Sequence, residues 1–264
     1  MKPINLIPAI ALLAASCDGI PPGERYIEVP AAKVERVVLL EDFTGQNCQN
    51  CPAAHRAIEK LQEQYGANLA AVSIHAGEFG IPATNTRYTG LMQPEGNVYN
   101  NRYGIDEYPM GVVDGRGPLN SDQWAKAVYD AVSKPTPLSI SLAAATDGAT
   151  VEIECGLLST AELSGNLVVW ITESGITARQ EDKDLGRVEN YTHDNVFRAC
   201  VNGIDGEAVT LAPGEPLSLS YSIPLRNTAT EKWVPANLAA VAFLKKGGAV
   251  EQAARANVTN QPNN

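Results

Sequence analysis

The sequence has few basic residues for its length and no long apolar run beyond its first segment. Its 20 lysines and arginines stand against 30 aspartates and glutamates, which gives a formal net charge of -10. An acidic surface of this kind argues against nucleic acid or anionic lipid as the main partner. After residue 16 no stretch is apolar for long enough to cross a bilayer as a helix. The 264 residues, 44% of them hydrophobic, are sufficient for two hydrophobic cores.

Cysteine is scarce, and the total of five is odd, so the cysteines cannot all pair within the chain. Two of them stand three residues apart in Cys48-Gln49-Asn50-Cys51. Thiols at this spacing can close a disulfide across the first turn of a helix and open it again. The spacing is typical of a redox dithiol more often than of a structural bridge.

The residues around this pair predict a strand, a tight loop and a helix, in that order. An apolar run over 37–40 precedes the pair, and a helical pattern over 54–65 follows it and ends at Gly66. A helix N-terminus favours negative charge, so we expect a lowered pKa for Cys48. Pro52 fits the first helical turn, where its missing N–H costs nothing.

Residues 1–16 have the features of a processed export signal. A short apolar segment is followed by small residues and then by Cys17. The pattern resembles a bacterial lipoprotein signal, which implies a mature chain that begins at a lipidated Cys17. Residues 17–31, rich in proline, would then be a linker that holds the body away from the membrane. Ordinary secretion with cleavage at another position is the alternative.

The residues before and after the dithiol resemble the thioredoxin family. The segment Asp42-Phe43-Thr44-Gly45-Gln46-Asn47-Cys48 has the spacing of that family, although Asn47 replaces the usual tryptophan. The resemblance implies an α/β thioredoxin-like domain over 32–134, in which Asp42 accepts a proton from Cys51. It also implies a cis peptide bond before Pro109 and a position for this proline beside the dithiol. Residues 76–102 exceed an ordinary connection and read as an insertion, which could contact substrate.

The second half of the chain alternates apolar and polar residues in short runs separated by turns. This pattern predicts an antiparallel all-β sandwich over 138–264. The expected strands are 138–145, 150–158, 166–172, 195–201, 217–223 and 236–244.

The order Cys155, Trp170, Cys200 resembles that of immunoglobulin-like domains, so we describe the expected domain as Ig-like. An oxidising compartment would permit Cys155 and Cys200 to pair as a structural disulfide. Two independently buried free thiols are the alternative.

The chain as a whole resembles the outer membrane protein 28-related lipoproteins of Gram-negative bacteria. Residues 191–198, with the sequence Tyr-Thr-His-Asp-Asn-Val-Phe-Arg, are similar to a segment typical of that group. The resemblance implies an outer-membrane lipoprotein that faces the periplasm or the cell surface. It implies no settled substrate or reaction.

A metal could also bind near the dithiol. Cys48, Cys51 and His75 form a donor set that suits copper or zinc, and His55 lies on the same helical face as Cys51. His75 ends a predicted strand at the same sheet edge as the dithiol, as in copper-delivery proteins of thioredoxin fold. We nevertheless expect no metal and no cofactor other than the redox-active disulfide, because an intact pair at this spacing normally works as a dithiol.

Two functions from different classes follow from these features. The first is a lipid-anchored thiol–disulfide oxidoreductase, in which the Cys48 thiolate attacks and Cys51 resolves, and whose partners are envelope proteins carrying a disulfide or a dithiol. The second is a non-catalytic lipoprotein that binds a protein or glycan through its β-sandwich. Access of solvent to the two sulfurs distinguishes them.

Overall fold

The computed structural model describes residues 35–261, which include three α-helices and fourteen strands. The signal peptide, Cys17 and the linker lie outside the described residues. The helices are α1 (Cys51–Tyr65), α2 (Pro94–Tyr103) and α3 (Trp124–Val132). The first seven strands are β1 (Val38–Thr44), β2 (Leu69–His75), β3 (Met110–Val113), β4 (Arg116–Leu119), β5 (Leu138–Thr146), β6 (Thr150–Ser159) and β7 (Leu163–Glu173). The others are β8 (Ile176–Asp182), β9 (Gly186–His193), β10 (Val196–Cys200), β11 (Glu207–Leu211), β12 (Leu217–Pro224), β13 (Leu238–Lys246) and β14 (Ala249–Asn260).

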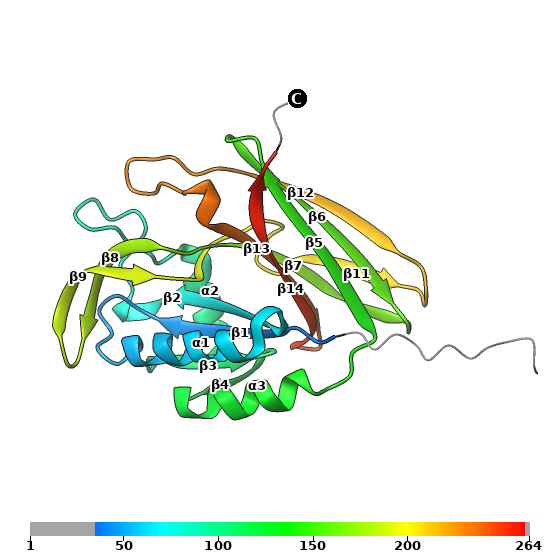
Figure 1. Ribbon diagram of the computed structural model, residues 1–264, viewed down its shortest axis with the longest axis horizontal. Helices are drawn as coiled ribbons and strands as arrows, with labels where there is room; N and C mark the ends of the chain where they lie inside the picture. Colours follow the sequence, from blue (N-terminus) through cyan, green and yellow to red (C-terminus); the bar gives the residue numbers. More distant parts are fainter. Residues whose placement is uncertain (1–34, 262–264) are drawn as a thin grey trace, which may run out of the picture. The chain divides into compact units, whose positions relative to one another are not determined.

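Twelve of the strands belong to one mixed sheet. Its order is β12-β6-β5-β14-β13-β7-β10-β2-β1-β3-β4, and β11 pairs with β7 beside this path. β8 and β9 form a separate two-stranded hairpin. The protein is therefore rich in β-structure with few helices, and most of it forms a β-sandwich-like body (Figure 1).

The helices pack on the part of the sheet that contains β1 and β2. These two strands are parallel, with α1 between them in the chain; β3 pairs antiparallel with β1, and β4 pairs antiparallel with β3. Alternate residues of β1 face opposite sides. Val38 and Leu40 pack with residues of α1 and α3, and Leu39 and Phe43 pack with Tyr99 of α2. Both faces of β1 are covered, so all seven of its residues are buried.

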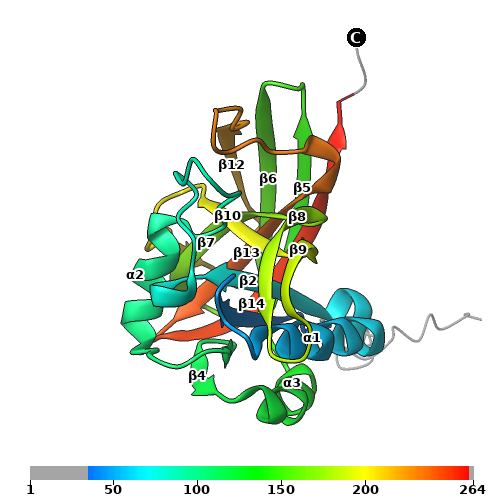
Figure 2. The same ribbon diagram turned by 90° about the vertical axis from the view of Figure 1, so that its left-hand side faces the viewer.

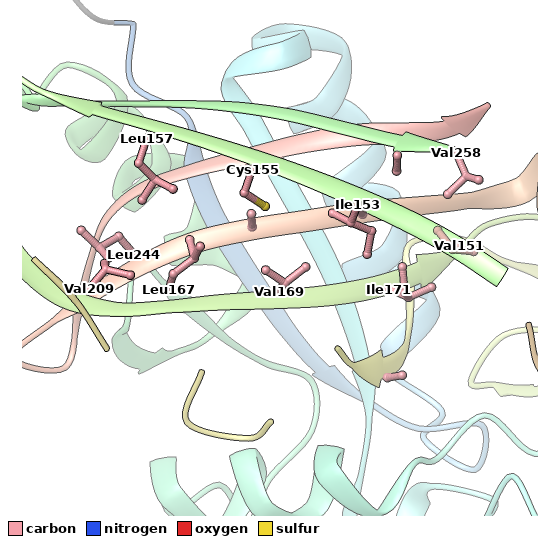
Figure 3. Close-up of a cluster of buried hydrophobic side chains, with 14 of the residues drawn as sticks. Val151, Ile153, Cys155, Leu157, Leu167, Val169, Ile171, Val209, Leu244 and Val258 are labelled. Atoms are coloured by element: carbon pink, nitrogen blue, oxygen red, sulfur yellow. The ribbon is translucent and has the colours of Figure 1, made fainter. Parts of the chain in front are cut away.

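The β-sandwich-like body has an apolar core between its layers. Side chains of β6 and β7 point toward one another, among them Ile153, Leu157, Leu167 and Val169 (Figure 3). Each of these four side chains is at most 1% exposed. Burial of this much apolar surface provides the main stabilisation of the body.

The predicted disulfide between Cys155 and Cys200 is wrong, because both residues are free thiols. Cys155 on β6 packs in the core shown in Figure 3. Cys200 on β10 packs in a different cluster, where its sulfur lies 3.2 Å from the hydroxyl of Tyr99. Trp170 packs on Tyr99 and Phe197, not on a cysteine bridge. The two thiols belong to separate cores, so they cannot meet.

Residues 191–198, singled out in the sequence, form a junction of the sheet. The chain leaves β9, passes Asn195 at a positive φ of 55°, and enters β10. The carbonyl of Asn195 accepts a hydrogen bond from the Ser73 N–H of β2, and β10 also pairs with β7. Arg198 is buried there in ion pairs with Glu173 and Glu231. The segment thus connects the helix-covered part of the sheet to the body.

Within the described residues, no helix combines the length and the apolar character needed to traverse a membrane.

Candidate functional site

Cys48 and Cys51 form a disulfide at the start of α1. The S–S distance is 2.06 Å, and Cys51 is the first residue of the helix, with Pro52 directly after it. The backbone N–H of Cys51 also donates to the Cys48 sulfur at 3.1 Å. Cys48 is only 3% exposed and Cys51 is fully buried. Both cysteines of the disulfide are thus almost entirely buried.

The hairpin of β8 and β9 is docked on the loop that carries Cys48. Two backbone N–H groups of the hairpin donate to that loop, from Glu181 to the Gln46 carbonyl at 2.8 Å and from Lys183 to the Gln49 carbonyl at 3.1 Å. The buried side chain of Gln180 donates to the carbonyl of Cys48 at 2.9 Å. Figures 1 and 2 show the hairpin reaching the N-terminal end of α1. These bonds hold the hairpin over the disulfide.

Asp42, the expected proton acceptor, is fully buried on β1. Neither of its carboxylate oxygens has a hydrogen-bond partner within residues 35–261. Burial raises the pKa of Asp42 to about 8, because the charged form loses its hydration. The carboxyl group therefore holds its proton at neutral pH.

Pro109 precedes β3, and the Tyr108–Pro109 peptide bond is cis. The next residue, Met110, pairs with Phe43 near the end of β1. Pro109 thus lies at the end of β1 from which the chain continues to the disulfide loop.

All three histidines of the chain gather beneath α1. His55 comes from α1, His75 is the last residue of β2, and His193 is the last residue of β9. The ring centroids of His75 and His193 lie 5.3 Å apart, and those of His55 and His193 lie 6.3 Å apart. The three residues are 20 to 138 positions apart in the chain, so only the tertiary structure brings them together.

The hydrogen bonding of these histidines is unequal. The Nε2 atom of His55 lies 2.9 Å from the Thr44 hydroxyl, and its Nδ1 atom lies 2.9 Å from the Tyr191 hydroxyl. His75 and His193 are each 2% exposed, and none of their four ring nitrogens has a partner in the described part of the chain.

Burial keeps these rings uncharged. It lowers the pKa of His55 to about 3 and that of His193 to about 4, and it lowers the pKa of His75 well below its usual range.

A pocket of about 200 Å³ opens beside the three rings. Ser73 and Gln62 contribute polar groups to its wall, and Glu59 and Asp194 contribute carboxylates. The complete lining is His55, Ile58, Glu59, Gln62, Ser73, His75, Ser174, Tyr191, Thr192, His193, Asp194 and Asn195.

The donor set Cys48, Cys51 and His75, considered for copper or zinc, is not available in this structure. The two sulfurs are bonded to each other, so neither can act as a thiolate ligand. Among residues 35–261, no three His, Cys, Asp or Glu side chains already stand in a metal-binding arrangement.

The β8–β9 hairpin and its part in this site were not predictable from apolar alternation. Its buried positions include Gln180, Asp182 and His193, which are polar, so the hydrophobic period of a strand is lost. The similarity of residues 191–198 to a family segment is the one signal in the sequence, and it assigns no role to His193. The structure places His193 in the wall of the pocket, with its ring near those of His55 and His75.

Residues 96–262 match the model of a protein family described as outer membrane protein Omp28. This match covers more than half of the chain and confirms the resemblance stated from the sequence. The family description agrees with the expected outer-membrane location. No curated protein matches the sequence.

Solved structures with similar folds have low sequence identity to this chain. HBP35 of Porphyromonas gingivalis superposes with a TM-score of 0.65 at 14% identity, over 85% of this chain and 76% of that one. A protein from Agrobacterium tumefaciens gives 0.51 at 17% identity, over 84% and 94%. A domain of the outer membrane lipoprotein Omp28 from Porphyromonas gingivalis gives 0.34 at 17% identity, over 48% and 92%, which is too low to support an argument. The first two similarities concern the fold alone.

Proposed function

Since the chain belongs to the Omp28 family of outer membrane proteins, we propose that it is a non-catalytic envelope lipoprotein that binds a protein or glycan through its β-sandwich-like body. The observation that carries this proposal is the burial of both sulfurs of the Cys48–Cys51 disulfide. In this proposal the disulfide is a structural bridge that fixes the loop beneath the β8–β9 hairpin.

Thiol–disulfide exchange requires a thiolate to approach a sulfur along the S–S axis, so its rate depends on access. Here the hairpin bonds to both sides of Cys48, through the carbonyls of Gln46 and Gln49. Gln180 and Arg179 add side-chain hydrogen bonds to the same loop. A substrate would have to displace these contacts before it could reach the disulfide.

The body offers a polar face suited to recognition. On β5, β6 and β12 the core-facing residues alternate with exposed ones, and Ser220 of β12 donates to the exposed Glu154 of β6 at 2.7 Å. Sheet faces of this kind serve as binding surfaces in many unrelated proteins, although fold alone does not establish function.

The access of reductant to the disulfide tests the proposal. Native protein is incubated with dithiothreitol, the reaction is stopped by alkylation, and labelling of Cys48 and Cys51 is followed by mass spectrometry. We expect reduction to be slower than in the guanidinium-unfolded protein by roughly tenfold or more, because the native hairpin blocks attack. A redox potential below about -300 mV would agree with a structural bridge.

The variant Gln180→Ala tests whether the β8–β9 hairpin protects the Cys48–Cys51 disulfide. It removes the side-chain hydrogen bonds to the carbonyls of Gly45 and Cys48 and leaves the disulfide itself unchanged. Reduction of Cys48–Cys51 should be faster in this variant than in the wild type. Equal and rapid reduction of native and unfolded protein would contradict the structural role.

A thioredoxin-like thiol–disulfide oxidoreductase is the second candidate, and the arrangement around β1 favours it. A disulfide at the N-terminus of α1, a buried Asp42 and the position of Pro109 at the end of β1 are the features that support it. In that function the Cys48 thiolate attacks a disulfide of an envelope protein. Cys51 then resolves the mixed disulfide. Asp42 can accept the Cys51 proton only in its ionised form, and its pKa of about 8 makes that form the minor one at neutral pH.

Reduction of insulin by the pre-reduced protein distinguishes the two candidates. Activity in the wild type that is lost in Cys48→Ser would establish the oxidoreductase. Absence of activity in both would support the binding protein.

A further inference from the structure

The pocket beneath α1 contains polar groups that the rest of the protein does not satisfy. Both ring nitrogens of His75 and both of His193 are buried without a hydrogen bond of good geometry in the described residues, while the backbone of Ala178 and Arg179 lies near enough to His193 to counter part of the burial effect on its pKa. Leaving a buried polar group unpaired costs about 1–3 kcal/mol. Some other buried polar side chains of the described residues are paired, whereas both carboxylate oxygens of Asp42 are not. For example, Arg36 donates to Asp114 at 2.7 Å, and Gln252 donates to the carbonyl of Leu138 at 3.0 Å.

The distance between the two rings suits two imidazoles that bind the same metal ion. Imidazoles bind zinc with Zn–N distances of about 2.0 Å, which places the centroids of two rings on one ion about 5 Å apart. The centroids of His75 and His193 are 5.3 Å apart. The adjoining pocket of about 200 Å³ has room for an ion and several waters.

A third imidazole stands next to this pair. The centroid of His55 lies 6.3 Å from that of His193, and its Nδ1 atom contacts the hydroxyl of Tyr191, which also lines the pocket. On the other side of the ring, the Thr44 hydroxyl lies 2.9 Å from Nε2. A hydrogen-bond partner behind a histidine orients the ring of a metal ligand.

The charges at the pocket favour a cation. Glu59 and Asp194 line it. The buried guanidinium of Arg198, whose charge, in addition to burial, helps to lower the pKa of His75, is paired with Glu173 and Glu231. Imidazole donors suit zinc, copper and nickel better than magnesium or calcium, which prefer oxygen ligands.

We propose that His75 and His193, with His55 as a third ligand, bind one divalent transition-metal ion of the zinc class in this pocket. The ligands do not yet converge on one point in residues 35–261, so the rings of His75 and His193 turn toward the pocket on binding. His55 exchanges the Tyr191 hydroxyl for the ion at Nδ1. The site uses neither sulfur of the disulfide, so it is independent of the proposed function and of the earlier Cys48, Cys51, His75 set.

Zinc binding to the full chain, prepared without a polyhistidine tag, tests the site. The protein is treated with a chelator, its free thiols are alkylated without reduction of the disulfide, and Zn²⁺ is titrated by calorimetry. We expect one equivalent to bind with a micromolar or tighter dissociation constant. His75→Gln and His193→Gln should each weaken binding by about tenfold or more, since each removes one of three ligands.

Gln62→Ala is the matched control, because Gln62 lines the same pocket but is not one of the proposed ligands. Its zinc affinity should equal that of the wild type. Circular dichroism and the intact Cys48–Cys51 disulfide confirm that each variant is folded.

X-ray absorption at the zinc edge keeps the proposal testable if the histidine variants do not fold. The wild-type complex should show imidazole nitrogen at about 2.0 Å. No binding below millimolar zinc, affinity unchanged in both histidine variants, or a coordination shell of oxygen or sulfur alone would each overturn the site. The pocket would then be a water-filled polar cavity.

Discussion

Two buried regions of this protein differ in chemistry although both exclude solvent. In the core of the body, Leu167 and Val169 are surrounded by other aliphatic side chains. Beneath α1, the buried Asp42, His75 and His193 carry polar atoms without partners in the described residues. Burial of apolar surface is favourable, whereas burial of an unpaired polar group is costly. The comparison indicates that the body supplies stability and that the pocket beneath α1 is maintained for binding or chemistry.

The largest effect should follow from a cavity in the core of the body. Leu167→Ala removes a fully buried side chain, and such substitutions cost about 2–5 kcal/mol because a cavity remains. Urea unfolding measures the change in the free energy of unfolding. A loss below about 1 kcal/mol would show that this core is not the main source of stability.

A pH-dependent effect should follow from Glu41, a buried carboxyl group on β1 that does have a partner. Burial raises its pKa from 4.5 to about 7, and the hydroxyl of Tyr103 donates to it at 3.0 Å. The folded state therefore keeps a proton that the unfolded chain releases. This contribution to stability is complete below about pH 4.5 and is lost as the pH rises through about 7.

Glu41→Gln removes this titration, since the amide stays neutral at every pH. Between pH 5 and pH 8, the free energy of unfolding of the wild type should fall relative to that of the variant. The difference should be roughly 3 kcal/mol at most. Urea unfolding at several pH values measures the difference. Parallel curves for the two proteins would contradict the raised pKa.

The smallest effect should follow from making the pocket resemble the core. His75→Leu replaces an unpartnered buried imidazole with an aliphatic side chain, which removes two unsatisfied nitrogens. In the presence of a chelator we expect the free energy of unfolding to change by no more than about 1 kcal/mol, or to increase. A loss above roughly 2 kcal/mol would mean that the ring has a structural role in the folded protein.

Elements with a local signal were predicted from the sequence. The helical period and Gly66 indicated α1, and Cys51 lies in its first turn. Apolar runs indicated β1 and β2, and alternation indicated six strands of the body close to their observed bounds. β14 was not predicted, because its alanine-rich sequence has a weak period.

The pairing of Cys155 with Cys200 was wrong because a spacing in the chain does not indicate in which core a side chain packs. Closure of Cys48 with Cys51 needs only one helical turn, so its geometry is local. The burial of that disulfide, by contrast, depends on hairpin residues about 130 positions away, such as Gln180.

The sequence by itself determined the family, the dithiol at the head of a helix and the β-rich second half, because each depends on short-range spacing or periodicity. Only the tertiary structure decided that the disulfide is covered and that three histidines share one pocket. The disulfide is covered by β8 and the turn after it, and the pocket forms where β9, β2 and α1 meet. These elements are distant in the chain. Packing brings these elements together, and no local pattern encodes how they meet.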